Sequence, residues 1–431
     1  MRAPMQSDPL RALRRLRNRF GAEAARAKCA LLGRLVRTRL RGARELERLH
    51  ELLCFMRAYP DDARLLAMVR RLLARFAHRS DLRAQREALE NSGIAGTAIR
   101  FPFFWPSARW LARRWPGRIA LDRLDHAAGR AIGKLLGVDH RLGGFAALDR
   151  IRPRGLSDAV QFIRLVEAMP GDDFAKEAFY DAIEPVIEIR PGRGTPDRTS
   201  AWHATGPIAW QRTALDRTRP DLAAEIRRPP RRVRRVPARE GERLLDLARA
   251  AMATRCRDLD AFAYGDAHQV RLVDDGGALA FMLNGVVAER RLAHATPYGV
   301  LTLRNGVPVG YLDVAMVRAR AELAFNTFPT FRNGEAAHIF ARVLAMAWTV
   351  LGARRFSVAP YQLGQHNHEA IGSGAWWFYF KFGFRPRDAT ARRLAQLERA
   401  RVRRDPGYRS SEATLERLAQ WPLYLGPRRR R

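Results

Sequence analysis

A short segment in the C-terminal third has the composition of a phosphate-binding turn. Its residues are Phe331, Arg332, Asn333, Gly334, Glu335 and Ala336. It follows a strand candidate over 321–327 and precedes a helix candidate over 336–351. A strand-to-helix turn directs unpaired backbone N–H groups and the helix dipole toward one point, which suits a pyrophosphate. Because Gly334 has no side chain, an anion can approach the backbone closely. We therefore expect an anion-binding loop here.

Two histidines farther along the chain have the spacing of metal ligands. His366 and His368 flank Asn367 in a segment that follows a strand candidate over 355–359. A zinc site needs three or four ligands, and the sequence offers no third ligand at a useful spacing. We therefore interpret the pair as polar loop groups and expect no metal, with contact to an acceptor substrate as the alternative.

The elements around the loop follow the order β-β-β-α-β-α. The strand candidates are 299–303, 307–314, 321–327 and 355–359, and the helix candidates are 336–351 and 373–382. Asn305-Gly306 between the first two strands predicts a tight hairpin. Gly383 stands where a helix C-cap is expected. A mixed sheet flanked by helices is the expected fold.

This order resembles the core of the GNAT superfamily of N-acetyltransferases. The hairpin with Val309-Gly310-Tyr311 looks like the second and third strands of that family. The loop is similar to its pyrophosphate motif, Gln/Arg-x-x-Gly-x-Gly/Ala. Gly334 and Ala336 match that motif, whereas Phe331 stands where Gln or Arg is usual. The resemblance covers about 90 of the 431 residues.

A third match lies in the last helix of that order. Residues 375–384, read as Ala-Trp-Trp-Phe-Tyr-Phe-Lys-Phe-Gly-Phe, resemble the family's Ala-x-x-Leu-Tyr-x-Lys-x-Gly-Phe. Tyr379, Lys381 and Gly383 are among the matching positions. Gly372 replaces the asparagine that is common three residues before the alanine.

The resemblance implies a set of site residues. Tyr379 would protonate the departing thiolate of a CoA thioester, and Glu322 would act as the general base, directly or through water. The exposed backbone of Phe325, Asn326 and Thr327 would pair with pantetheine. The residues expected at the pyrophosphate are Arg332, Asn333, Gly334, Glu335 and Ala336. The structural alternatives are a core tyrosine at 379 and a carboxylate on a strand face at 322.

The composition is strongly basic. The formal net charge is +34, and only four of the 78 basic residues are lysine. So lopsided a ratio, together with abundant Ala, Leu and Gly, resembles a GC-rich bacterial genome. A modest acidic count nevertheless leaves a real basic excess. That excess favours an anionic partner, either CoA or another polyanion that contacts the run Arg227–Arg235.

The chain is long enough for several domains. The expected organisation is an all-helical N-terminal domain over 1–189, a Pro/Arg-rich linker over 190–239, a GNAT-like domain over 240–388 and a basic helical tail over 389–431. Overall this predicts an α+β protein. Aromatic residues alternate with arginines over 101–115, and we interpret them as a plug between helices, with membrane or base contacts as alternatives.

Several classes of protein are disfavoured by the same sequence. No apolar run approaches the roughly 20 residues of a membrane span, and the Arg-rich start is no secretory signal. The three cysteines Cys29, Cys54 and Cys256 show no metal-ligand spacing, which favours a reduced, cytoplasmic compartment.

The expected function is acyl-CoA-dependent N-acyl transfer, most simply from acetyl-CoA to an amine. The two rivals are a GNAT-like binding module without catalysis and a nucleic-acid-associated basic protein.

Overall fold

The computed structural model describes residues 8–138, 143–332 and 334–426, and its architecture is α+β. The chain divides into two compact units, each built from separate stretches of sequence. Unit 1 contains residues 1–214, 237–267 and 303–308, and unit 2 contains residues 215–236, 268–302 and 309–431. Among the described residues, no helix is both long enough and apolar enough to cross a membrane.

The first part of unit 1 is a helical layer with its own apolar core. Its helices are α1 Pro9–Leu16, α2 Ala22–Arg37, α3 Ala43–Ala58, α4 Ala63–Ala74 and α5 Ser80–Ala84, with the 3-10 turn η1 Phe76–His78. Apolar residues recur on α3 at spacings of three and four, and all of them are buried: Leu46, Leu49, Leu53 and Met56. Asp62 caps α4 by accepting a hydrogen bond from the Leu65 N–H at 2.8 Å. The helical character expected of the N-terminal region is confirmed for this layer.

The second part of unit 1 surrounds a small antiparallel sheet. Its strands are β1 Ile99–Phe101, β2 Ile119–Leu121 and β3 Ile187–Ile189, with β3 in the middle. Its helices are α6 Trp105–Arg114, α7 His126–Leu135, α8 Gly144–Ile151, α9 Asp158–Glu167 and α10 Asp173–Ile183, and α12 Ala238–Ala253 and α13 Asp260–Ala263 complete unit 1. The N-terminal region is mostly helical, as predicted, but it is not all-helical. Strands of three residues are too short to show a period of two.

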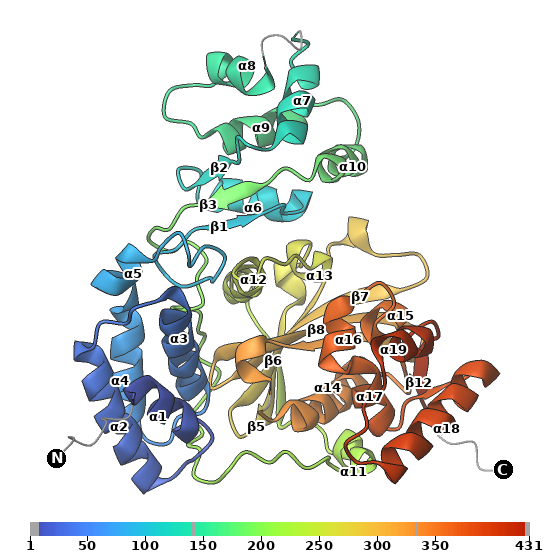
Figure 1. The fold of residues 1–431 in the computed structure, drawn as a ribbon. Helices are drawn as coiled ribbons and strands as arrows, with labels where there is room; N and C mark the ends of the chain where they lie inside the picture. The colour runs from blue at the N-terminus through green and yellow to red at the C-terminus, as the bar shows by residue number, and fades with distance from the viewer. Residues whose placement is uncertain (1–7, 139–142, 333, 427–431) are drawn as a thin grey trace. The chain divides into compact units, whose positions relative to one another are not determined.

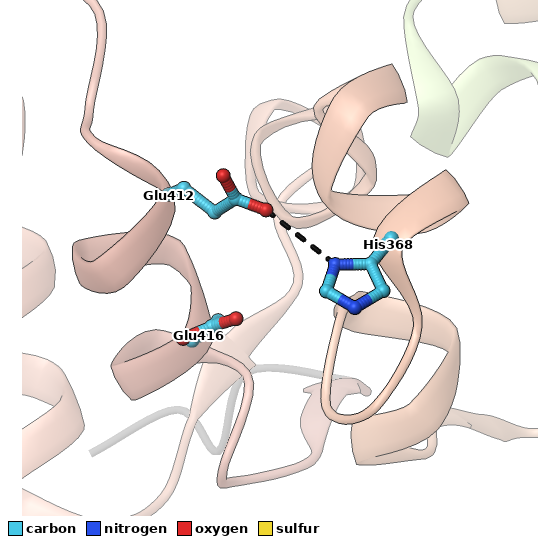
Figure 2. Close-up of side chains that lie close together, drawn as sticks. All are labelled: His368, Glu412 and Glu416. Carbon is cyan, nitrogen blue, oxygen red and sulfur yellow. Dashed lines mark ion pairs between the residues drawn. The ribbon is translucent and has the colours of Figure 1, made fainter.

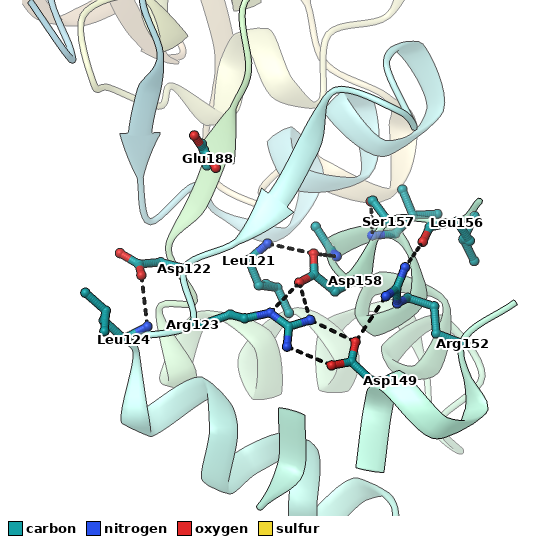
Figure 3. A network of polar contacts seen from close by, with 12 residues as sticks. Leu121, Asp122, Arg123, Leu124, Asp149, Arg152, Leu156, Ser157, Asp158 and Glu188 are labelled. Carbon is teal, nitrogen blue, oxygen red and sulfur yellow. Dashed lines mark hydrogen bonds and ion pairs between the residues drawn. The ribbon is translucent and has the colours of Figure 1, made fainter. Parts of the chain in front are cut away.

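A network of charged groups connects the end of β2 to two helices. Arg123 donates to both carboxylate oxygens of Asp149, at 2.7 and 2.8 Å, and to Asp158 at 3.1 Å (Figure 3). The other oxygen of Asp158 accepts the N–H of Leu121 at 3.0 Å. Hydrogen bonds to Asp149 raise the pKa of Arg123 above its ordinary value. Such bidentate pairs fix geometry, so the network positions α8 and α9 against the small sheet.

The aromatic segment of residues 101–115 lies in the core of unit 1. Phe103 and Trp105 are 1% exposed, and the Trp110 and Trp115 rings meet edge to face with centroids 5.1 Å apart. These side chains pack with the small sheet and α9. The interpretation as an aromatic plug is confirmed.

Unit 2 is built on a nine-stranded sheet within the described residues. The strand order is β11-β12-β10-β9-β8-β7-β6-β5-β4, and Figure 1 labels β5, β6, β7, β8 and β12 of this sheet. The strands are β4 Arg232–Arg235, β5 Arg271–Gly276, β6 Leu279–Gly285, β7 Thr296–Arg304, β8 Val307–Val317, β9 Arg320–Thr327, β10 Arg355–Val358, β11 Arg385–Pro386 and β12 Leu423–Leu425. The helices are α11 Leu222–Arg227, α14 Ala336–Val350, α15 Pro360–Leu363, α16 His368–Ser373, α17 Ala375–Lys381, α18 Ala389–Arg404 and α19 Glu412–Leu418, with the 3-10 turns η3 Ala267–Gln269, η4 Ala288–Arg290 and η5 Pro329–Phe331.

The order predicted from the sequence matches β7, β8, β9, α14, β10 and α17 of this unit. β6 was not predicted, because all its residues are buried and its side chains therefore show no alternation. β12 lies between β10 and β11, so the C-terminal residues 389–426 supply a strand of the sheet in addition to α18 and α19.

The segment 215–236, part of the expected linker, is attached to α14. Arg342 of α14 is 3% exposed and makes two 2.7 Å hydrogen bonds to the carboxylate of Asp275. It also donates to the backbone carbonyls of Glu225 and Arg228, at 2.7 and 2.9 Å. Burial opposes its charge, but the bonds to Asp275 prevail and raise the pKa of Arg342. One buried guanidinium thus connects β5, α14 and the region of α11.

Candidate active site

The parallel strands β9 and β10 are paired over only part of β9. Arg355, Phe356 and Ser357 lie opposite Arg320, Ala321 and Glu322, and the pairing ends there. β9 continues to Thr327 and remains paired with β8 along its whole length. Within the described residues, the stretch 323–327 therefore has a strand neighbour on one side only. Its other edge presents backbone N–H and C=O groups that can pair with an extended ligand.

Tyr379 of α17 lies at this open edge. The backbone N–H of Phe325 donates a hydrogen bond to its phenol oxygen. Strand N–H groups lie in the plane of the sheet, and β8 occupies the other side of β9, so this bond places the phenol beside the unpaired stretch. The side chain is 2% exposed. Burial raises the pKa of the Tyr379 phenol well above its ordinary value, so the group keeps its proton at neutral pH.

An aromatic cluster holds α17 against β9 and α14. Phe340 of α14 lies at its centre, with its ring centroid 5.1 Å from Phe325 and 5.5 Å from Tyr379. Phe378 stacks on Phe325 with the rings 6.2 Å apart. Aromatic pairs at these separations stabilise a defined mutual orientation. The cluster therefore fixes the position of the phenol along the strand.

The loop expected to hold a pyrophosphate joins β9 to α14. Phe331, at the first position of the motif, is 2% exposed and belongs to the core. It therefore offers no side-chain contact to an anion. Arg332 folds back and donates to the Thr327 carbonyl at 3.0 Å and to Glu369 at 2.5 Å. Its guanidinium thus holds the loop against the end of β9, and a phosphate would have to share it with Glu369.

The remaining loop residues lie at the start of α14. Asn333 is outside the described residues. Gly334 is buried and donates its N–H to the Phe331 carbonyl at 3.2 Å. Glu335 is the N-cap residue, and its side chain makes no capping hydrogen bond to the helix. Among the described bonds, the helical ladder begins with the Ile339 N–H, which donates to the Glu335 carbonyl at 2.9 Å, so amides of the first turn of α14 lie where an anion site requires them.

The strand residues expected beside pantetheine lie in the open stretch. Phe325, Asn326 and Thr327 are the last three residues of β9. Opposite them, β8 approaches unusually closely at Gly310. A Cβ atom at Gly310 would lie 2.5 Å from the Asn326 carbonyl oxygen and 3.2 Å from the Thr327 Cα. A glycine is therefore required there by the packing of the two strands.

The structure does not bring Glu322 beside Tyr379. Glu322 is half-buried and paired with Ala315 and Ser357. It precedes Phe325 by three residues, about 10 Å along the strand, and an odd spacing puts its side chain on the opposite face of the sheet. The Glu322 side chain is therefore not adjacent to the residue that binds the phenol, since about 10 Å of strand separates them.

The two histidines of the His-x-His pair have separate surroundings. His366 is exposed with a left-handed φ of 53°, and Asn367 between them caps α16. His368 lies beside Glu412 and Glu416 of α19, with its Nδ1 3.5 Å from the Glu412 carboxylate (Figure 2). All three side chains of this group are exposed. Solvated groups of this kind often gather without an ion, and we assign no metal to them.

Comparison with family models, with curated proteins and with solved structures found no match.

The sequence pattern did not indicate two neighbours of the phenol. Phe340 lies within the helix candidate 336–351, and no motif distinguishes it there. Tyr311 lies opposite Asn326 on β8, and its electrostatic effect reaches the Tyr379 phenol. The resemblance names Tyr311 only as part of the hairpin match Val309-Gly310-Tyr311, and the strand register was needed to place it near the phenol. Together, an open strand edge, a protonated phenol and a helix start can bind a thioester and supply a proton to its sulfur.

Proposed function

We propose that unit 2 carries out acyl-CoA-dependent N-acyl transfer, most simply from acetyl-CoA to an amine. The observation that carries this proposal is the Tyr379 phenol at the edge of β9, beyond the point where β10 stops pairing. The start of α14, one short loop later, supports the same function. The resemblance to GNAT acetyltransferases adds the expectation that the pyrophosphate of CoA lies at this helix start.

In the proposed reaction, pantetheine extends along residues 323–327 and pairs with backbone groups other than the Phe325 N–H and the Thr327 carbonyl, which Tyr379 and Arg332 already occupy. The nitrogen lone pair of the acceptor amine attacks the thioester carbonyl carbon and forms the new C–N bond. As the carbonyl reforms, the C–S bond breaks and its electron pair goes to sulfur. Tyr379 donates its proton to the thiolate, and the nitrogen gives up a proton to a base. Much of the rate would come from fixed orientation.

The route of the second proton is constrained by the position of Glu322. Because Glu322 lies about 10 Å from Phe325 along β9, we expect it to accept the proton through intervening water. The phenolate left by Tyr379 is itself strongly basic, since burial raises the pKa of that group. Reprotonation of the phenol by the same relay would complete the cycle and leave the enzyme unchanged.

A binding module without catalysis is the second candidate, and the loop favours it. Phe331 is buried, and Arg332 is already paired with Glu369. Glu335 adds a negative charge beside the helix start, where it would repel a phosphate. This module would recognise CoA or a related anion without releasing free thiol.

Two measurements test the proposal. Calorimetric titration of the full chain with acetyl-CoA and CoA measures binding, and detection of free thiol with a library of amines measures transfer. Gly334→Val should weaken binding of CoA at least about tenfold, about 1.4 kcal/mol, by blocking the approach to the loop backbone. Gly372→Ala is the matched control, because a Cβ atom there meets nothing within 4 Å.

The outcomes separate the two candidates. Binding followed by amine-dependent thiol release supports the transferase. Binding that depends on Gly334 without any thiol release supports the binding module. A folded Gly334→Val variant with unchanged affinity for CoA would remove the pyrophosphate assignment from both.

A further inference from the structure

A hollow in unit 2 is lined by positive charge. It has a volume of about 800 Å³ and lies among α17, α18, the segment 405–410 and the side chain of Arg219. Among the described residues, six cations line it and no carboxylate does; the cations are Arg219, Lys381, Arg385, Arg399, Arg403 and Arg409. Volumes of this size accommodate a small organic ligand. The resemblance that suggested the acyltransferase site covers only the α17 side of this hollow, because it ends before α18.

Backbone carbonyls hold several of these guanidinium groups in place. Arg219 donates to the Lys381 carbonyl, and Arg409 donates to the carbonyls of Pro406 and Tyr408. Such bonds fix the position of a cation without neutralising its charge. The arrangement is therefore preorganised for an anion, because little side-chain freedom remains to be lost on binding.

Arg399 and Arg403 contribute charge from one face of α18. They are exposed and one helical turn apart, a spacing at which like charges repel. Among the described ion pairs neither residue has a carboxylate partner. The neighbouring Glu398 does not form an ion pair with either arginine. It is 1% exposed and accepts hydrogen bonds from Tyr408 and Ser410, at 3.0 and 2.6 Å. A bound anion would relieve this repulsion.

An aromatic wall accompanies the cations. Trp377 is half-buried, and its indole N–H donates to the Ser410 hydroxyl at 3.1 Å, which fixes the plane of the ring. Lys381 follows one turn later on the same side of α17. Tyr379 is two residues from Trp377, about 200° around the helix, and faces β9 instead. The hollow therefore lies on the other side of α17 from the phenol.

We propose that this hollow binds a phosphorylated nucleotide, separately from the thioester site. Arginine forks match phosphate oxygens in pairs, and aromatic rings bind bases by stacking. Inorganic phosphate would leave most of the volume and the aromatic wall unused. Two kinds of molecule carry this chemistry: a free nucleoside triphosphate and the phosphorylated end of a nucleic acid strand.

The experiment measures the affinity of the full chain for ATP by calorimetry at about 0.15 M salt, where exposed long-range charge effects are screened. Sodium triphosphate, a 5′-phosphorylated ten-nucleotide DNA strand and CoA are titrated in parallel. The test variant is Arg399→Ala/Arg403→Ala. The control is Arg392→Ala/Arg393→Ala, which removes the same charge from exposed positions of α18 that do not line the hollow. Circular dichroism confirms that both variants are folded.

We expect one ATP site, with triphosphate bound at least about tenfold more weakly because it lacks a base to stack. The test variant should weaken ATP binding at least about tenfold, and the control less than about twofold. Binding of CoA should be the same in both variants. Displacement of ATP by the DNA strand would identify the end of a nucleic acid as the natural ligand. If the strand does not displace ATP, the natural ligand is a free nucleotide.

Three results would overturn the proposal. The first is an equal loss of ATP affinity in both double variants, which would mean unspecific attraction by positive charge. The second is ATP affinity unchanged in the test variant, which would place ATP elsewhere. The third is a parallel loss of CoA affinity in the test variant, which would make the hollow part of the CoA site.

Discussion

The backbone N–H of Phe325 donates a hydrogen bond to the phenol oxygen of Tyr379 at the open edge of β9. Because the oxygen accepts this bond, the phenolic O–H keeps its donor function for another partner. A thioester sulfur lying along the same edge would be that partner. The relationship therefore connects a feature of the sheet, the short pairing of β9 with β10, to one step of the proposed reaction.

Replacement of Tyr379 by phenylalanine tests this step. The ring and its packing on Phe340 remain, while the proton donor is lost. We expect kcat to fall by about 10²–10⁴, the usual contribution of acid–base catalysis. Binding of acetyl-CoA should change little, because the hydroxyl matters mainly as charge develops on sulfur. Stability should fall by no more than about 1–2 kcal/mol.

Tyr361→Phe is the matched control, since Tyr361 is 57% exposed on α15. It should leave thiol release and binding unchanged. Undiminished turnover in Tyr379→Phe would mean that water or another group protonates the sulfur, and that α17 contributes structure alone.

The close approach of β8 and β9 predicts a steric effect at Gly310. Alanine at this position would put its Cβ 2.5 Å from the Asn326 carbonyl oxygen, an atom that cannot move without its strand. Gly310→Ala should therefore lower the free energy of unfolding by about 1–3 kcal/mol. Urea unfolding followed by tryptophan fluorescence measures it. Binding of CoA should weaken as well, because the displaced backbone belongs to the open stretch.

Gly372→Ala in α16 provides the contrast. Its Cβ would meet no atom within 4 Å, and alanine favours a helix by about 1 kcal/mol over glycine. Equal stability of the two variants would show that β9 adapts to a side chain at 310.

Local sequence patterns predicted which helices and strands form in unit 2. They predicted less well which residues lie next to one another in space. The hairpin at Asn305-Gly306 was readable because both residues adopt left-handed φ values, 47° and 78°, which these two residue types tolerate. The same pattern could not show that the buried Asn305 side chain donates to the Ala58 carbonyl at 2.8 Å. That bond joins residues 247 positions apart.

The candidate site illustrates the same limit. The motif placed Tyr379 on a helix, but its position at the open edge depends on where β10 stops pairing, which is a matter of register. The sequence shows that Phe331 replaces the usual Gln or Arg of the motif, and the structure shows that this side chain is buried. Glu322 was chosen from its place in the strand, and about 10 Å of strand separates it from Phe325, the residue that binds the phenol.

Substitution of the buried Arg342 of α14 should cause a large loss of stability. Arg342→Met would leave the carboxylate of Asp275 buried without its partner, and would remove the bonds to the carbonyls of Glu225 and Arg228. Breaking a buried pair from one side typically lowers stability by about 3–5 kcal/mol. Limited proteolysis should then cut within 215–231 sooner than in the unmodified chain.

Arg354→Met is a suitable comparison. Arg354 also donates to backbone carbonyls, those of Trp348 and Ala353, but no carboxylate depends on it. Its loss should lower stability by less than about 1 kcal/mol. Similar small effects of both substitutions would show that the Arg342 network contributes little to stability.

Two carboxylates at the start of α6 predict a pH dependence of unit 1. Asp258 accepts hydrogen bonds from the Phe104 N–H at 3.0 Å and from the Ser107 hydroxyl, and Asp181 accepts the Trp105 N–H at 2.9 Å. Burial raises the pKa of each carboxyl to about 6. Their protonated forms are therefore favoured more by the folded than by the unfolded chain.

Because the pKa of these carboxyls is higher in the folded chain, their contribution to stability decreases as the pH rises. A carboxyl whose folded pKa lies above its unfolded value stabilises the fold fully below the unfolded pKa. This contribution is lost as the pH rises through the folded pKa. For Asp258 the shift from 3.8 to about 6 corresponds to about 3 kcal/mol, present near pH 4 and lost above pH 7.

Asp258→Asn cannot ionise and should remove this part of the dependence. Urea unfolding between pH 4 and pH 8 gives the difference between the two chains, in which other titrating groups largely cancel. The asparagine variant should gain stability relative to the unmodified chain as the pH rises. Parallel curves would mean that Asp258 titrates near its ordinary pKa, and that water reaches the start of α6.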